Sequence, residues 1–219
     1  MGTVTLIGTF HEERGRVSSS ELNEILKRVT PEVIFIEEPP SVWKGLAVLS
    51  KTKPLESAAI SKYIETASAE LVPVDLYTPP EPYVSHVREV LSYVERVSDT
   101  FCQLVDLNKA KMEAEGFSYL NGEFHEQVEL AIRNEIVRIL GLRKSDPFDR
   151  AYEAWRGQDE RREVEMVRNI ERYFFENRFE RAILLVGSGH RASIAKIANG
   201  RDTTDSTGLH WDYSSHWYI

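Results

Sequence analysis

Two short turns carry the residues best suited to chemistry. Gly8-Thr9-Phe10-His11 follows an apolar run near the N-terminus, and Gly187-Ser188-Gly189-His190 follows another near the C-terminus. Glycine lets the backbone turn sharply or approach a ligand closely, and imidazole can ligate a metal or act as a general base near neutral pH. One Gly-x-x-His turn is common by chance. Two of them at the ends of predicted strands indicate a shared site, because ligands bind beyond the carboxyl ends of parallel strands.

Carboxylates are expected at the same edge of the sheet. Glu37 and Glu38 follow the apolar run VIFI, and Asp75 lies near the end of a further run. A single acid there would be explained as a turn cap or a solvated side chain. Together with two histidines, these acids predict a site made of His11, Glu37 and His190. Such donors suit Zn²⁺, Mn²⁺, Fe²⁺ or Co²⁺, and a bound ion would lower the pKa of water toward about 7. Without a metal, a histidine oriented by a glutamate would activate water directly.

A further histidine–carboxylate group consists of Glu123, His125 and Glu126. It falls at the start of a predicted helix, where acidic residues interact favourably with the helix dipole. We therefore expect this group to lie outside the site.

The elements that must position these residues follow from the hydrophobic pattern. Four short apolar runs rich in β-branched residues predict buried strands. They are Thr3–Ile7, Val33–Ile36, Leu71–Leu76 and Ala182–Val186. Continuous apolar runs are typical of a parallel sheet covered on both faces, and amphipathic patterns between them predict helices. One helix begins with Ser18 and Glu21 as a capping box. The sequence thus predicts an α/β fold with a mostly parallel central sheet flanked by helices.

The stretch between the third and fourth predicted strands has no strand-like run. It holds amphipathic helical patterns instead, the last from about Tyr152 to Phe179. We predict one α/β domain over residues 1–219, in which residues 79–180 form a large helical insertion, or lid, before the last core strand. Such insertions commonly roof a site at the sheet edge. The alternative is a helical layer that serves only the core.

Composition excludes several classes of function. The formal net charge is −8 and no long run of Lys or Arg occurs, which argues against nucleic acid as a partner. No segment approaches the roughly 20 apolar residues of a membrane span, and the N-terminus does not resemble a signal peptide. The lone Cys102, within an apolar helical pattern, is expected to be a buried structural thiol in a reducing compartment. We therefore expect a cytoplasmic protein with no membrane partner.

The motifs together resemble the TraB/Tiki/ChaN/erythromycin-esterase-like superfamily. Four segments carry the resemblance: GTFH after the first strand, IFIEE, the strand ending PVDL, and RREVEMVRNI followed by ILLVGSGHRASI. The family's arginine, four residues before a methionine, falls on Arg162 and Met166. The resemblance implies an α/β sheet with a helical insertion and a site at the strand ends. About a quarter of the chain matches at the level of motifs.

The branches of that superfamily imply different chemistry. The Tiki branch implies a metal-dependent peptidase that uses both Gly-x-x-His turns and a glutamate. The esterase branch implies hydrolysis by histidine-activated water without an obligatory metal, although it has a glutamate where this chain has Thr9. The ChaN branch implies heme binding. Carried over by position, the site residues are His11, Glu37, Arg162 and His190, and Glu38 competes with Glu37.

Two hypotheses follow. The first is a hydrolase acting on a peptide or ester, with His11, Glu37 and His190 around a divalent metal or an activated water. Arg162 would then hold an anionic group or stabilise an oxyanion, or it would only anchor the insertion by an ion pair. The second is a binding protein of the same fold that holds heme, a peptide or another small ligand without turnover.

Overall fold

The computed structural model describes residues 1–219 except 78–80, 142–146, 203–207, 215–216 and 218–219. The strands form one parallel sheet in the order β3-β2-β4-β1-β5. They are β1 (Gly2–Thr9), β2 (Val33–Ile36), β3 (Glu70–Pro73), β4 (Arg181–Gly187) and β5 (Leu209–Asp212). The predicted α/β fold with a parallel sheet is thereby confirmed.

The register of the sheet brings three strand ends together. β4 lies in the middle, between β1 and β2. Thr9, the last residue of β1, pairs with Gly187 of β4, and Ile36, the last residue of β2, pairs with Leu185 of β4. The segments that follow β1, β2 and β4 therefore leave the sheet at one edge, where a shared site can form.

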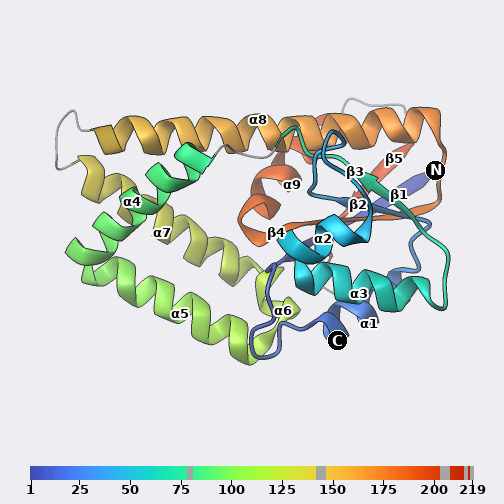
Figure 1. Ribbon diagram of the computed structural model, residues 1–219, viewed down its shortest axis with the longest axis horizontal. Helices are drawn as coiled ribbons and strands as arrows, with labels where there is room; N and C mark the ends of the chain where they lie inside the picture. Colours follow the sequence, from blue (N-terminus) through green and yellow to red (C-terminus); the bar gives the residue numbers. More distant parts are fainter. Residues whose placement is uncertain (78–80, 142–146, 203–207, 215–216, 218–219) are drawn as a thin grey trace.

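Helices cover both faces of the sheet (Figure 1). One face packs against α1 (Ser19–Val29), α2 (Leu46–Thr52) and α3 (Pro54–Ile64), and the other against α8 (Pro147–Glu176) and α9 (Ser188–Asp202). Side chains of β2 alternate between these layers, since Ile34 and Ile36 join the first core and Phe35 joins the second. Burial on both faces explains why the strands are apolar throughout rather than alternating.

The predicted insertion is a group of helices beside the sheet (Figure 1). It comprises α4 (Glu81–Val97), α5 (Asp99–Glu115), α6 (Phe117–Leu120), α7 (Glu123–Gly141) and the first part of α8. Residues 79–80 and 142–146 of the predicted range lie outside the described residues. The insertion has a core of its own, made of Val90, Val94, Phe101, Ile136, Ile139, Leu140 and Tyr152.

Helix α8 joins the two parts of the molecule. Its 30 residues form one uninterrupted helix, about 45 Å long at 1.5 Å per residue. Tyr152, near its start, packs in the insertion core, whereas Met166 and Phe174 pack under the sheet. The segment between these ends passes beside the carboxyl ends of the strands, so α8 can present side chains to a site there.

Two local expectations need adjustment. Ser18 caps α1 by accepting a hydrogen bond from the Glu21 backbone N–H at 3.2 Å, but the Glu21 carboxylate accepts from the Phe117 backbone N–H instead of closing the capping box. The prediction that Cys102 is buried is wrong, because its side chain is only partly buried. Helix α5 buries one narrow face, which includes Phe101, and Val105 in the same apolar pattern is 37% exposed.

Within the described part of the chain, no helix combines the length and the apolarity that crossing a membrane requires.

Candidate functional site

The strand ends bring His11, Glu37 and His190 together, as the sequence predicts. The Nε2 atom of His11 lies 4.0 Å from Oε2 of Glu37, and the Nε2 atom of His190 lies 3.7 Å from Oε1 of the same carboxylate. Glu37 therefore stands between two imidazole rings that come from opposite ends of the chain.

The side chains of Glu37 and Glu38 point in different directions. The Glu38 carboxylate accepts a hydrogen bond from Thr52 Oγ1 at 2.6 Å and lies 3.6 Å from Lys53 Nζ. It turns toward the junction of α2 and α3, whereas Glu37 turns toward the histidines. Glu38 is thus a structural residue beside the site.

Glu37 is a buried carboxylate held by two donors. Arg162 Nη2 donates to its Oε1 at 2.7 Å, and the Gly187 backbone N–H donates to its Oε2 at 2.8 Å. Burial alone would raise the pKa of Glu37, but the charges of Lys53, His190, Arg162 and His11 outweigh it and hold the pKa well below its usual range. Glu37 is therefore a fixed negative charge.

Gly187 permits this close arrangement. A Cβ at position 187 would lie 3.4 Å from His11 Nε2 and 3.5 Å from Glu37 Oε2. These are ordinary van der Waals distances, so the glycine that ends β4 leaves room for one methyl group beside the backbone N–H that reaches the carboxylate.

Each histidine is fixed by a second, buried glutamate. His11 Nδ1 lies 2.7 Å from Glu56 Oε1, and His190 Nδ1 lies 2.8 Å from Glu163 Oε1. A carboxylate at Nδ1 favours the proton on that nitrogen and so directs Nε2 toward Glu37. The site is therefore two histidine–glutamate pairs that share Glu37.

Local structure places the two outer glutamates. Glu56 lies in the first turn of α3, which begins beside β1 because the Leu55 backbone N–H donates to the carbonyl of His11 at 3.2 Å. Thr9 Oγ1 also donates to Glu56 Oε1, at 2.5 Å. Glu163 projects from the middle of α8, and Ser193 Oγ of α9 donates to its Oε2.

The charge state of His190 follows from its surroundings. Burial alone would lower the pKa of His190, but the hydrogen bond to Glu163 and the charges of Glu37 and Asp159 outweigh it and raise the pKa. The environment thus favours the protonated ring.

Sequence reasoning missed Glu56 and Glu163, although each leaves a signal. Glu56 occupies an apolar-face position of α3 beside Ala59 and Ile60, and Glu163 occupies one on α8 ahead of Met166 and Val167. An acid on an otherwise apolar helix face is costly to bury unless it is paired. Such positions could have been marked as partners for the histidines.

The Arg162 guanidinium contacts three carboxylates. Its guanidinium donates to Asp75 at 2.8 Å as well as to Glu37, and it lies 3.4 Å from Asp159. Burial raises the pKa of Asp159, and the guanidinium acts against that rise. Of the two roles expected for Arg162, these contacts match an ion-pair anchor that positions Glu37.

Asn121 ties the insertion to the site. Its side-chain amide accepts from the Gly8 backbone N–H at 2.6 Å and donates to the Gly8 carbonyl at 3.0 Å. The buried amide thus pairs with Gly8 near the end of β1, the first residue of the turn that ends at His11. This contact links the α6–α7 junction to the first Gly-x-x-His turn.

A pocket of about 450 Å³ opens at the two turns. It is lined by His11, Glu12 and the residues around them in the first turn, and by residues 187–190 of the second. We call it the strand-end pocket. It gives a small molecule access to both histidines.

The Glu123–His125–Glu126 group lines a separate pocket of about 340 Å³, which it shares with Ser188 and Gly189 of the second turn. His125 is buried against Tyr119, edge to face, and its Nε2 lies 3.8 Å from Glu129. Burial lowers the pKa of His125 to about 4, and the charges of Arg191 and Arg133 add to that effect. Among the residues that the structure describes, this histidine forms no hydrogen bond or ion pair with Glu37 or with either paired histidine.

The chemistry of the donors fits a divalent metal ion. Two imidazole nitrogens and a carboxylate are donors that Zn²⁺ or Mn²⁺ accepts, and a carboxylate on the far nitrogen is the usual second contact of a ligating histidine. The residues concerned are His11, His190 and Glu37. Among the residues that the structure describes, no three His, Cys, Asp or Glu side chains stand at ligating spacing.

Comparisons with models of protein families, with curated proteins and with solved structures found no match to this chain. The resemblance carried by the GTFH, IFIEE and GSGH motifs therefore stays a prediction.

Proposed function

We propose that this protein is a hydrolase that activates water between His11 and Glu37. One observation carries the proposal: a buried carboxylate stands between two histidines whose other ring nitrogens each pair with a buried glutamate. Groups of this kind, with an access pocket, are the parts that acid–base hydrolysis requires.

The gap between His11 and Glu37 suits a water molecule. The separation of 4.0 Å between Nε2 and Oε2 is too long for a direct hydrogen bond but is spanned by one water that donates to both atoms. His11 then takes a proton from this water as the general base. Glu37 orients the water, and Glu56 stabilises the imidazolium that forms.

His190 supplies the second half of the reaction. Its raised pKa favours the imidazolium, which can donate a proton to the leaving group or stabilise the developing oxyanion. Glu163 holds the ring in place, and Arg162 holds Glu37. The substrate is an ester or an amide, including a peptide bond, whose carbonyl enters the strand-end pocket.

The donor types of the same residues would accept a divalent ion, although no three described side chains of this kind stand at ligating spacing. His11, His190 and Glu37 would hold it, and it would supply a bound water of lowered pKa at neutral pH. The same three residues form the proposed site with or without the ion, and the experiment below distinguishes the two cases.

The test is a panel of chromogenic esters and amides, assayed with chelator and with added Mn²⁺, Co²⁺ or Zn²⁺. We expect turnover that His11→Ala and His190→Ala each abolish and that Glu38→Gln retains. Elemental mass spectrometry of the native protein and of His11→Ala shows whether metal is bound and lost. Turnover that survives both histidine substitutions would contradict the proposal. Retention of heme or another ligand without turnover would favour a binding protein.

A further inference from the structure

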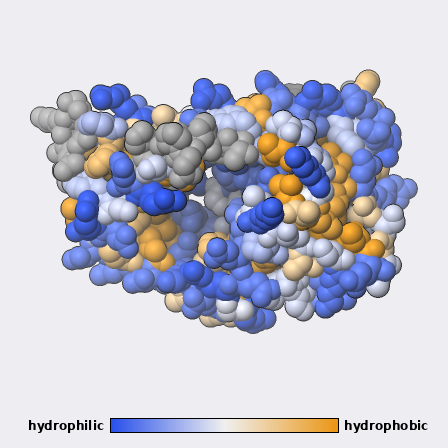
Figure 2. Space-filling view, in the orientation of Figure 1, coloured by the Kyte–Doolittle hydropathy of each residue, from blue (hydrophilic) through white to orange (hydrophobic). Residues whose placement is uncertain are grey.

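A second pocket lies on the insertion side of His190. It has a volume of about 420 Å³, and His190, Asp159 and Arg162 form the end nearest the site. Its walls come from α4, α5, α7 and α8, and Figure 2 shows the surface hollowed between the insertion and the sheet. The apolar wall includes Leu91, Phe101, Ile132, Ile136, Tyr152 and Trp155. We call it the insertion pocket.

Two arginines in this pocket form no ion pair with a described carboxylate, although Arg133 acts electrostatically on Glu129 and Arg156 acts on Asp159. Arg133 donates to the Gly189 carbonyl at 2.5 Å and has no ion pair with a described residue. Arg156 has neither a hydrogen bond nor an ion pair among the residues the structure describes. Both are only partly buried, so their guanidinium groups can meet a bound molecule.

The other charged groups of the pocket are already engaged. Asp159 lies 3.4 Å from Arg162, whose guanidinium also serves Glu37 and Asp75. The Glu129 carboxylate accepts from Asn108 Nδ2 at 3.0 Å. The lining therefore has three guanidinium groups against two carboxylates, although the whole chain has a formal net charge of −8, and Arg133 and Arg156 are the two guanidinium groups without an ion pair among the described residues.

We infer that the insertion pocket binds a small amphipathic anion, with an aromatic or branched apolar body and a carboxylate, sulfonate or similar group. The body packs among the aromatic and aliphatic walls, and the anionic group pairs with Arg156 and Arg133. Binding of the anion does not depend on the proposed function. The further step, that the anion is the substrate, does rest on it, because His190 lines both pockets. A volume of about 420 Å³ suits a small molecule rather than a polymer.

The probe is anilinonaphthalenesulfonate, an apolar aromatic anion whose fluorescence rises on binding. Its matched control is phenylnaphthylamine, which has the same ring system without the sulfonate. The native protein should bind the anion at least tenfold more tightly than the neutral compound. Arg156→Gln should remove most of that preference, on the order of tenfold for one charge-assisted contact, and Arg156→Lys should keep part of it.

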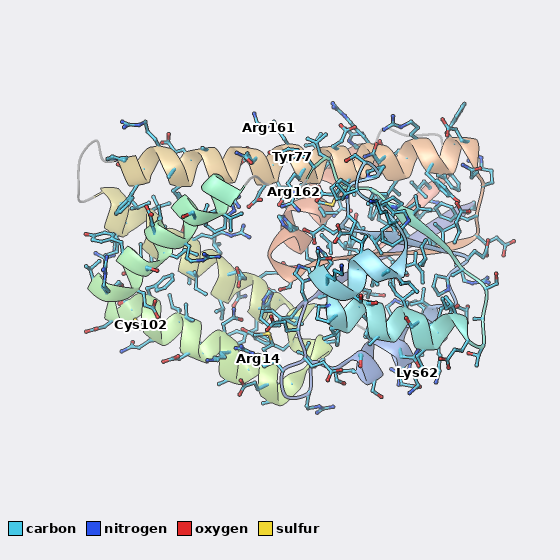
Figure 3. All side chains as sticks on the ribbon, viewed as in Figure 1. Arg14, Lys62, Tyr77, Cys102, Arg161 and Arg162 are labelled. Atoms are coloured by element: carbon cyan, nitrogen blue, oxygen red, sulfur yellow. The ribbon has the colours of Figure 1, made fainter. Side chains whose placement is uncertain are left out.

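Two further variants locate the binding. Arg161→Gln is the matched control, because Arg161 is exposed and lies on the opposite side of α8 from Arg162 (Figure 3), so binding should change less than twofold. Ile132→Trp fills the insertion pocket without altering an arginine and should abolish binding of both compounds. Equal binding of the two compounds, or an unchanged preference in Arg156→Gln, would overturn the inference.

The outcome can be separated from that of the proposed function. Glu37→Gln should lose hydrolysis and keep binding of the anion. If the anion binds with the expected dependence on Arg156 and no ester or amide is turned over, the pocket stands and the hydrolase proposal fails. If hydrolysis depends on His11 but binding ignores Arg156, the hydrolase stands and the anionic substrate is wrong.

Discussion

The His11–Glu56 pair and the His190–Glu163 pair approach Glu37 from two sides, and they differ in exposure and in the charges around them. The His11 side chain is 36% exposed, and that of His190 is 16% exposed. His190 also has Asp159 nearby, which helps raise its pKa. Two rings with the same kind of partner are therefore suited to opposite tasks, because the more open one can exchange protons with water and the enclosed one retains its proton.

The outer glutamates differ as well. Both oxygens of Glu163 accept hydrogen bonds, from His190 and from Ser193. In Glu56, one oxygen serves both His11 and Thr9, and the buried Oε2 has no hydrogen-bond partner among the described residues. Position in the fold, rather than residue type, thus distinguishes the proposed base, His11, from the proposed acid, His190.

The largest expected effect comes from Glu37, the carboxylate that both pairs share. Glu37→Gln should lower kcat/KM by about 10²–10⁴-fold, because it removes the charge that orients the water and that helps hold the proton on His190. Steady-state assays on the best ester or amide measure this, with Glu38→Gln as the control. A larger loss of kcat/KM in Glu38→Gln than in Glu37→Gln would show that Glu38, and not Glu37, is the catalytic carboxylate.

His125 is a buried histidine that has no glutamate at Nδ1, and it therefore contrasts with His11 and His190. Its Nδ1 atom has no hydrogen-bond partner among the described residues. Its folded-state pKa of about 4 lies below the ordinary value of 6.5, so the folded state favours the neutral ring. The resulting stability is present above pH 6.5 and is lost as the pH falls toward 4. The loss should be on the order of 3 kcal/mol.

Urea unfolding of the native protein and of His125→Phe across this pH range tests that linkage. The variant should show a flatter dependence of the free energy of unfolding on pH. Superimposable profiles would mean that His125 is not held neutral.

Substitutions of Glu56 and Glu163, the two outer glutamates, distinguish the proposed roles of the two histidine–glutamate pairs. Glu163→Gln and Glu56→Gln should each lower kcat about 10- to 100-fold, the size found when the partner of a functional histidine is removed. Only Glu163→Gln should move the alkaline limb of the pH–rate profile to lower pH, because losing that carboxylate lowers the pKa of His190. An identical shift in both variants would erase the proposed division of roles.

The smallest expected effect concerns Gly187. Gly187→Ala places a methyl group 3.4 Å from His11 Nε2 and 3.5 Å from Glu37 Oε2, which is ordinary van der Waals contact but takes up space beside both groups. We expect a few-fold loss of kcat, on the order of 1 kcal/mol in the barrier, with little change in stability. Gly189→Ala is the control, because nothing lies within 4 Å of its added Cβ. Equal losses in both variants would show that contact with His11 is not the cause.

Much of the fold could be predicted because buried parallel strands have continuous apolar runs. Val33–Ile36 is a strand as predicted, and the described part of the predicted insertion consists of helices with short connections. β5 (Leu209–Asp212) is harder to recognise, because it is a four-residue edge strand that mixes apolar and polar side chains. Its place beside β1 depends on tertiary pairing, which no local pattern encodes.

The site was predictable only where it coincides with strand ends. His11, Glu37 and His190 each follow a strand, and parallel topology brings such positions together. Glu56 and Glu163 come from helices, and their partners are 45 and 27 residues away, so spacing alone does not pair them. Arg162 entered through the family resemblance, and its three acidic neighbours emerge only in three dimensions.

The uninterrupted course of α8 also limits how this gene can change. Tyr152 and Glu163 lie on the same helix, one in the wall of the insertion pocket and the other behind His190. Inserting or deleting one residue between them would turn one end of the helix about 100° relative to the other, because each residue advances an α-helix by that angle. A point substitution at an exposed position in this stretch of α8 leaves the relative orientation of its two ends intact, whereas a length change there would remove either the pocket wall or the partner of His190.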